Sequence, residues 1–198
     1  RVGLRGERPQ TNRSGFVFSS SSFSASQDSV GSVFRLTLDA DVIARAEQMG
    51  LLALSDRYAK GTMSGMDRLL VRSIHWLSVA LAQDEPESAI ISLIVALECM
   101  FKPAAGSSIT STVCESTAFL LSDSKESRLS ISSTIREFYG KRSAIAHGGK
   151  KAVTESERTL LLQYVSATIL TVLNLDEVDT QQKLMQWVEE NKFGGSGG

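Results

Sequence analysis

The sequence predicts an all-α protein, a helical bundle that follows a short N-terminal arm or strand pair. Apolar residues recur at the three- and four-residue spacing of amphipathic helices through most of the chain, and typical helix start and stop residues bound these stretches. Hydrophobic residues make up 42% of the 198 residues, which is enough for one core. We expect an N-terminal arm at 1–38, a helical domain at 39–193 and an engineered glycine-serine linker at 194–198.

The N-terminal arm differs in composition from the rest of the chain. Its basic start is followed by a serine-rich stretch at 19–26, which favours a flexible arm, with a basic arm that touches RNA as the alternative. The arginines of this start are Arg1, Arg5, Arg8 and Arg13. Two short strands are also predicted, at 15–18 and at 32–38, and in the second strand apolar residues alternate onto one face.

The helical pattern begins after Asp39, which is a suitable N-cap for a helix at 40–49 that ends at Gly50. Asp67 can cap a longer helix that extends to about Gln83. The inner face of this second helix is expected to carry Leu70, Ile74, Leu77 and Leu81. Each of the two helices thus has an identifiable start, and the second has one apolar face to bury.

The next predicted helix, 86–101, is apolar nearly all round, as expected for the central helix of a bundle. A proline occupies its first turn, where the missing N–H does no harm, and Pro103 stops it. A further helix starts at Ser107 or Ser108 and ends near Ser122.

Three more helices complete the predicted bundle. The first spans 124–147 with a break near Gly140. Its apolar residues are Leu129, Ile131, Ile135 and Phe138. A capping-box pattern opens the second helix at 154–174, and the third spans about 180–191.

The segment 138–149 carries the residues with the clearest chemistry. Arg142 and His147 lie five positions apart, and His147 precedes a glycine pair that ends the helix. Arginine binds a phosphate with a planar fork of donors, and histidine exchanges a proton near neutral pH. Together they can cleave a phosphodiester without a metal. The alternative is a histidine that only caps the last carbonyls of the helix.

The stretch from Tyr139 to Gly148, with Ala96-Leu97-Glu98 upstream, resembles the HEPN domain family, most closely its Apea-like subgroup. The resemblance covers about 67–175, and the matching motif residues are Arg142, Ser143, His147 and Gly148. It implies an all-α, usually dimeric fold and a metal-independent ribonuclease that would suit a toxin or antiviral defence effector. Other members of the family only bind or dimerise. The resemblance also implies that 1–38 is the end of an upstream β-rich domain.

The spacing of the two motif residues favours a dimer. On a straight helix of 3.6 residues per turn, Arg142 and His147 point about 140° apart. One chain does not aim both at one phosphate unless the helix distorts at its glycines. A two-fold homodimer would bring two such pairs to one cleft, because the same patch faces itself across the axis. The resemblance implies the same arrangement.

Several neighbours are expected to support this site. The cations expected to contact RNA, with a solvated helix end as the alternative, are Arg136, Lys141, Lys150 and Lys151. Glu98 lies in an apolar helix and needs a cationic partner, for which Arg142 is favoured over Arg72. Ser143 can bind phosphate or assist the histidine, with a local helix contact as the alternative. Tyr139 can stack on a base or donate to phosphate, with a place in the core as the alternative.

Net charge, cysteine spacing and the length of the apolar runs limit the range of possible functions. The net charge of −1 gives no global field for nucleic acid, so RNA must use a local patch. No cofactor and no metal is expected, because Cys99 and Cys114 lack metal-ligand spacing and His75, beside Trp76, has no partner at such a spacing. The two thiols favour a reducing, cytoplasmic setting. The longest apolar run, 89–101, is shorter than the roughly 20 residues that span a membrane.

The favoured function is therefore a metal-independent endoribonuclease. The RNA 2′-hydroxyl would attack its adjacent phosphate, with His147 as proton donor or acceptor and Arg142 stabilising the developing charge. The expected products are a 2′,3′-cyclic phosphate and a 5′-hydroxyl, and DNA should resist. One alternative is a catalytically inactive HEPN-like module that dimerises and binds RNA or a nucleotide. Another is a purely helical dimerisation or scaffold domain.

Overall fold

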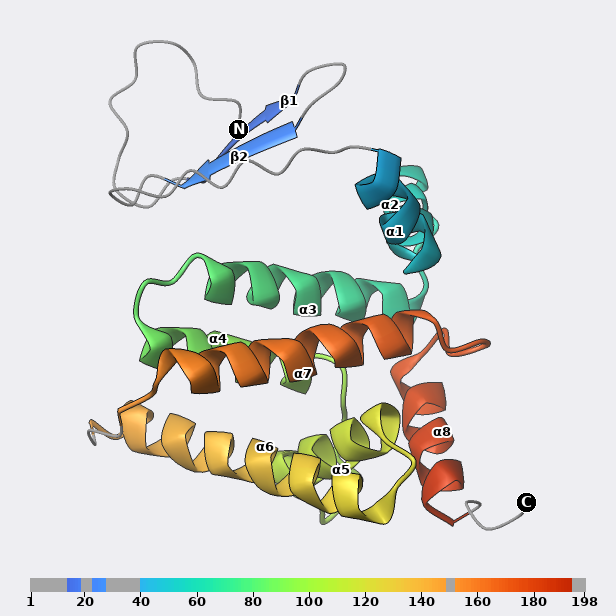
Figure 1. Ribbon diagram of the computed structural model, residues 1–198. Coiled ribbons are helices and arrows are strands. Elements are labelled where there is room, and N and C mark those ends of the chain that lie inside the picture. Colours follow the sequence, from blue (N-terminus) through green and yellow to red (C-terminus); the bar gives the residue numbers. More distant parts are fainter. Residues whose placement is uncertain (1–13, 19–22, 28–39, 149–151, 194–198) are drawn as a thin grey trace. The chain divides into compact units, whose positions relative to one another are not determined.

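The computed structural model describes residues 14–18, 23–27, 40–148 and 152–193. These residues contain one strand pair and eight helices, and the expected all-α helical bundle is confirmed (Figure 1). The strands are β1 (Ser14–Phe18) and β2 (Phe23–Gln27). The helices are α1 (Ala40–Gln48), α2 (Leu51–Lys60), α3 (Gly65–Leu81), α4 (Pro86–Glu98), α5 (Ile109–Leu121), α6 (Lys125–Ala146), α7 (Glu155–Leu173) and α8 (Gln181–Phe193).

The chain divides into two compact units, residues 1–52 and 53–198. In the first unit, β1 and β2 pair antiparallel. The first strand agrees with the prediction, but β2 occupies part of the serine-rich stretch that was expected to be flexible, since its apolar and polar residues alternate. The other predicted strand, 32–38, lies outside the described residues. α1 has nearly the expected bounds, and Gly50 follows it with a φ of 77°.

The start of α3 and the helix before it differ from the prediction. The sequence pattern did not indicate α2, which has one buried residue, Leu54. α3 begins at Gly65 because Ser64, not Asp67, is its N-cap. The Asp67 N–H donates to the Ser64 hydroxyl at 3.0 Å, and the Ser64 N–H donates to the Asp67 carboxylate at 2.9 Å. The Arg57 guanidinium donates to both Asp67 oxygens, at 2.7 and 2.9 Å, and so joins α2 to α3.

The Asp67 ion pair makes the stability of the fold depend on pH. Hydrogen bonds from Arg57 and then from Ser64 lower the pKa of the buried Asp67 carboxyl. Such a group stabilises the fold above its unfolded pKa of about 3.9, and this contribution disappears as the pH falls through the folded-state value. We expect Asp67→Asn to melt below wild type at neutral pH, with the difference narrowing in acid. A difference in melting temperature that stayed constant from about pH 7 to about pH 2 would contradict this linkage.

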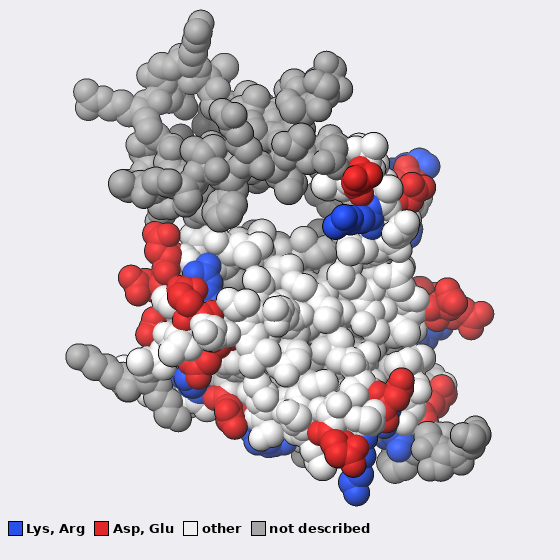
Figure 2. All heavy atoms as spheres, in the orientation of Figure 1, with Lys and Arg blue, Asp and Glu red and all other residues white. Residues whose placement is uncertain are grey.

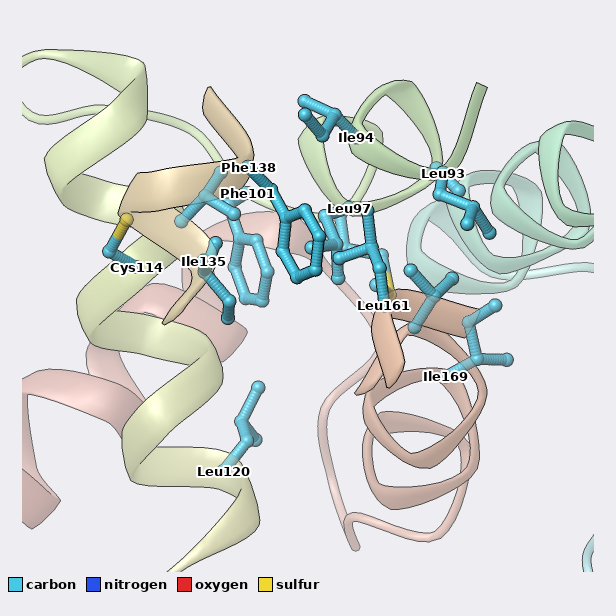
Figure 3. Close-up of a cluster of buried hydrophobic side chains, with 14 of the residues drawn as sticks. Leu93, Ile94, Leu97, Phe101, Cys114, Leu120, Ile135, Phe138, Leu161 and Ile169 are labelled. Carbon is cyan, nitrogen blue, oxygen red and sulfur yellow. The ribbon is translucent and has the colours of Figure 1, made fainter. Parts of the chain in front are cut away.

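α4 is the central helix of the second unit, as its apolar sequence predicts. It packs against α3, α5, α6 and α7. α4 ends at Glu98, three residues before the predicted end, and four apolar residues of the predicted span are fully inaccessible to solvent: Ile90, Leu93, Leu97 and Met100. Side chains of α4, α5, α6 and α7 meet in this core (Figure 3). The Ser73 hydroxyl also donates to the Ala96 carbonyl at 2.7 Å, which ties α3 to α4.

The caps of the remaining helices agree with the sequence. Ser108 caps α5, Ser124 caps α6, and Thr154 with Glu157 forms the capping box of α7. α6 differs in one respect, because it continues through Gly140 without the predicted break. A glycine costs a helix interior only about 1 kcal/mol, which the packing of the adjoining turns on the core offsets.

Two of the apolar residues named in the predicted helices are exposed, and one of them, Leu81, was expected on an inner face. Leu129 of α6 is 63% exposed, because it lies two positions before Ile131 and so points away from the face that Ile131 and Ile135 bury. Leu81 is the last residue of α3 and is 55% exposed. The helical repeat therefore predicts which way a side chain points. It does not predict where a neighbouring helix stops covering that side of the helix.

The surface formed by α7 carries little charge. No charged residue occurs between Arg158 and Asp176. Figure 2 shows the same property, since the charged side chains gather toward the edges of the visible face and its centre is uncharged. This face of the unit therefore offers little attraction for nucleic acid. Among the described residues, none of the helices has the length and apolar character needed to cross a membrane.

Candidate functional site

The C-terminal end of α6 carries the predicted motif. His147 is the C-cap of this helix, and its N–H donates to the Ser143 carbonyl at 3.1 Å. Gly148 follows with a φ of 74°, a left-handed conformation that ends the helix and favours glycine. His147 is exposed, near carbonyls that have no donor within the helix. The helix end thus places an accessible imidazole in a region of partial negative charge.

Arg142 forms an ion pair with Glu98, the last residue of α4. The Arg142 Nη1 donates to the Glu98 Oε1 at 2.8 Å, and the two side chains are 33% and 20% exposed. This contact confirms Arg142, rather than Arg72, as the partner of the carboxylate in the apolar helix. The guanidinium has further N–H donors. The pair therefore fixes the direction of the arginine while leaving donors for a second acceptor.

A pocket of about 320 Å³ lies on the Arg142 side of α6. Its lining residues are Thr110, Tyr139, Arg142, Ser143 and Ala146. The four from α6 are spaced three and four positions apart, so they share one face of the helix. Thr110 is the second residue of α5. The pocket thus brings three of the predicted site residues together with the first turn of a neighbouring helix.

Tyr139 contributes a buried hydroxyl to this pocket. The residue is 8% exposed and its ring belongs to the core, which was the alternative predicted for it. Its hydroxyl is shielded from solvent and lies beside the Glu98 carboxylate, although not in ideal hydrogen-bond geometry. Burial, and then the nearby Glu98 carboxylate, raise the pKa of this hydroxyl. It is therefore protonated at neutral pH and can donate to the Glu98 carboxylate.

Arg142 and His147 do not share a face of α6. Because the helix is uninterrupted, their five-residue separation leaves them about 140° apart. His147 instead lies in line with Ser143, Gly140 and Arg136, which precede it by four, seven and eleven positions. All four are exposed, and we name this row the exposed stripe of α6. Ser143 belongs to both the pocket and the exposed stripe. Around the helix axis, it therefore points in a direction between those of Arg142 and His147.

The cations expected on RNA have different environments. Arg136 is exposed on the stripe. The Lys141 ammonium donates to Glu157 at 2.5 Å and to the Ala152 carbonyl at 3.3 Å, and its side chain is 19% exposed. This lysine joins α6 to the start of α7, so a contact with RNA would have to compete with that ion pair. Lys150 and Lys151 lie outside the described residues.

Among the described residues, no three histidine, cysteine or acidic side chains are grouped so as to hold a metal ion. His75 is exposed and packs edge-on against Trp76, with ring centroids 5.9 Å apart. Cys99 and Cys114 are free thiols, and burial raises the pKa of each.

Comparison with protein-family models, with curated proteins and with solved structures finds no match for this chain. The site has two parts: the pocket on the Arg142 side of α6 and the exposed stripe that ends at His147.

Sequence reasoning missed two residues of this region. Thr110 reaches the pocket from α5, and Glu157 holds Lys141. Both lie in the first turn of a helix whose cap was visible in the sequence. The caps predict where those helices start, but the packing of α5 and α7 against α6 decides what their first turns touch.

Proposed function

We propose that this chain is a metal-independent endoribonuclease of the HEPN type that acts as a two-fold homodimer. The observation that carries the proposal is an exposed histidine at a helix end, five positions after an arginine that a carboxylate holds in place. His147 would donate or accept the proton that moves during attack by the RNA 2′-hydroxyl. Arg142 would stabilise the charge that develops on the phosphate.

The proposal includes a dimer because Arg142 and His147 point in different directions on a single chain. A two-fold axis near the exposed stripe would place His147 of each protomer close to its counterpart, since an isologous interface brings a patch against itself. Arg136 would add one cation from each protomer to the same cleft. Gly140, with no side chain, lies at the centre of the stripe and would permit close approach of the two helices.

The substrate class follows from the proposed chemistry. Attack by a 2′-hydroxyl requires RNA, so DNA of the same sequence is not a substrate. A role as a toxin or an antiviral defence effector is suggested by the family resemblance alone. The test is incubation of the purified protein with single-stranded RNA and with the matching DNA, both in EDTA. We expect cleavage of RNA only, and intact RNA at equimolar protein would contradict the proposal.

A second candidate is a module that binds RNA or a nucleotide without cleaving it. The observation that favours it is the pocket, which gathers Arg142, Ser143 and Tyr139 but not His147. Binding of an oligonucleotide without cleavage, and with equal affinity in wild type and His147→Ala, would select this candidate.

A further inference from the structure

The end of α6 that carries His147 lies outside the core. Tyr139 is the last buried residue of this helix, and Val153 is the next buried residue along the described chain. The described residues between these two, at 140–148 and at 152, are exposed or only partly buried. Ile145 packs partly against the core. Because apolar burial contributes little here, polar contacts have to fix this part of the chain.

Lys141 links the end of α6 to the start of α7. Its ammonium donates to the Glu157 carboxylate at 2.5 Å and to the Ala152 carbonyl at 3.3 Å, and we name these two contacts the Lys141 link. Ala152 directly precedes Val153, so the lysine holds the chain just before it returns to the core. The end of α6 and the start of α7 lie on the same side of the unit (Figure 1).

The partners of this lysine are themselves held by other contacts. The Glu157 Oε2 accepts from the Thr154 N–H at 3.0 Å, within the capping box of α7, and its Oε1 accepts from Lys141. Hydrogen bonds from Lys141 and then from Thr154 lower the pKa of this carboxyl, so it is charged at neutral pH. The Val153 N–H donates to the Glu87 carboxylate of α4 at 3.3 Å. The link therefore joins α6 to a segment that two further contacts fix.

The next residue of α6 holds the helix from a second direction. Arg142 pairs with Glu98 of α4 at 2.8 Å, and successive helical residues point about 100° apart. Both cations lie within two turns of His147. The Lys141 side chain is 19% exposed and that of Glu157 is 35% exposed, so solvent screens this pair less than a fully exposed one. Two ion pairs to different helices thus set the direction of the helix end.

We propose that Lys141 is a positioning residue for His147, because the Lys141 link fixes the end of α6 against the start of α7. The inference rests on the proposed function, in which His147 transfers the proton. It replaces the RNA contact expected for Lys141 from the sequence, and it adds Glu157 as the carboxylate on which this positioning depends.

The test compares kcat and KM for RNA cleavage in matched variants. Lys141→Met removes the ammonium, and we expect it to lower kcat by about tenfold with little change in KM, since displacing a reacting group by about 1 Å can cost about 10²-fold. Lys141→Arg keeps the charge and the N–H donors and should cleave nearly as wild type does. Lys60→Met is the control, because it removes a lysine from an ion pair with Asp56 on α2.

Glu157→Gln separates positioning from direct contact with RNA. The glutamine keeps an oxygen that can cap α7 but loses the charge that holds Lys141. If Lys141 positions His147, Glu157→Gln should lower kcat about as much as Lys141→Met does. If Lys141 instead binds phosphate, Glu157→Gln frees the ammonium and should lower KM, while Lys141→Met should raise KM and leave kcat unchanged. The second pattern would overturn the inference.

Hydrogen exchange without RNA tests the link by itself. In Lys141→Met and in Glu157→Gln, the amides at 143–147 should exchange roughly threefold to tenfold faster than in wild type, while those at 131–138 keep their rates. Unchanged exchange at 143–147 would overturn the inference even if the protein cleaves RNA. Faster exchange in a protein that leaves RNA intact would show the link without the enzyme, so the nuclease proposal can fail separately.

Discussion

His147→Ala and Arg142→Ala should each lower RNA cleavage by about 10²–10⁴-fold, the range in which positioned proton transfer contributes to catalysis. His147 is exposed, so its removal should leave the helical content and the melting temperature close to those of wild type. His75→Ala is the matched control, since His75 is also exposed but lies on α3, away from the motif. A His147→Ala protein that cleaves as fast as wild type would exclude the proposed role.

The Arg142→Ala experiment needs an additional control, because Arg142 is paired with Glu98 in the fold. Arg142→Ala leaves the half-buried Glu98 carboxylate unpaired, which can lower stability by itself. The double variant Glu98→Gln with Arg142→Ala removes that charge, and we expect it to regain stability but not cleavage. Arg142→Lys should also cleave poorly, because an ammonium keeps the charge but loses the planar fork. Glu98→Gln alone should have a milder effect, acting through the position of Arg142. Cleavage restored in the double variant would contradict a role in catalysis.

Gly140→Leu should convert the protein to a folded monomer and abolish most of the RNA cleavage. A Cβ added at Gly140 meets no other atom within 4 Å in the single chain, and Gly140 is exposed, so the substitution fits the protomer. The helix itself should gain about 1 kcal/mol of stability, because leucine has the higher helix propensity. Across a two-fold axis, however, the two leucines would push the exposed stripes apart. Light scattering, circular dichroism and cleavage measured on one preparation would test the three expectations together.

The control for this variant is Ser130→Leu. Ser130 is exposed on the same helix, about 15 Å nearer its N-terminus. We expect this protein to remain dimeric and active, which would show that added apolar surface alone does not alter assembly. A Gly140→Leu protein that is dimeric and active would mean that the stripe does not lie at the dimer axis. A wild-type protein that is monomeric and fully active would remove the dimer from the mechanism.

Much of the helical fold could be predicted because its signals are local. The capping box at Thr154 and the serine cap at Ser108 lie where the structure starts α7 and α5. The apolar surface of α4 correctly predicted its central place. The missed features depend on tertiary contacts. Burial of Leu54 and the ion pair of Arg57 hold α2 in place, and neither shows in a helical repeat.

Contacts within the site could be predicted from the sequence only where a physical requirement demanded a particular partner. A carboxylate in an apolar helix needs a cation, and this requirement led correctly to the pair between Glu98 and Arg142. Lys141 had no such constraint in the sequence, and its pairing with Glu157 depends on how α7 packs beside α6. The position of the buried Tyr139 hydroxyl beside Glu98 is a property of the folded core, so the sequence could not reveal it.

The measurement that tests the central claim most directly is the chemistry of the cleaved ends. Single-stranded RNA would be treated with the wild-type protein in EDTA, and the fragments analysed by mass spectrometry, with His147→Ala treated in parallel. The account predicts a 2′,3′-cyclic phosphate on one fragment and a 5′-hydroxyl on the other, formed by wild type and lost in the variant. Fragments with a 3′-hydroxyl and a 5′-phosphate, or RNA that stays intact with wild type, would contradict it.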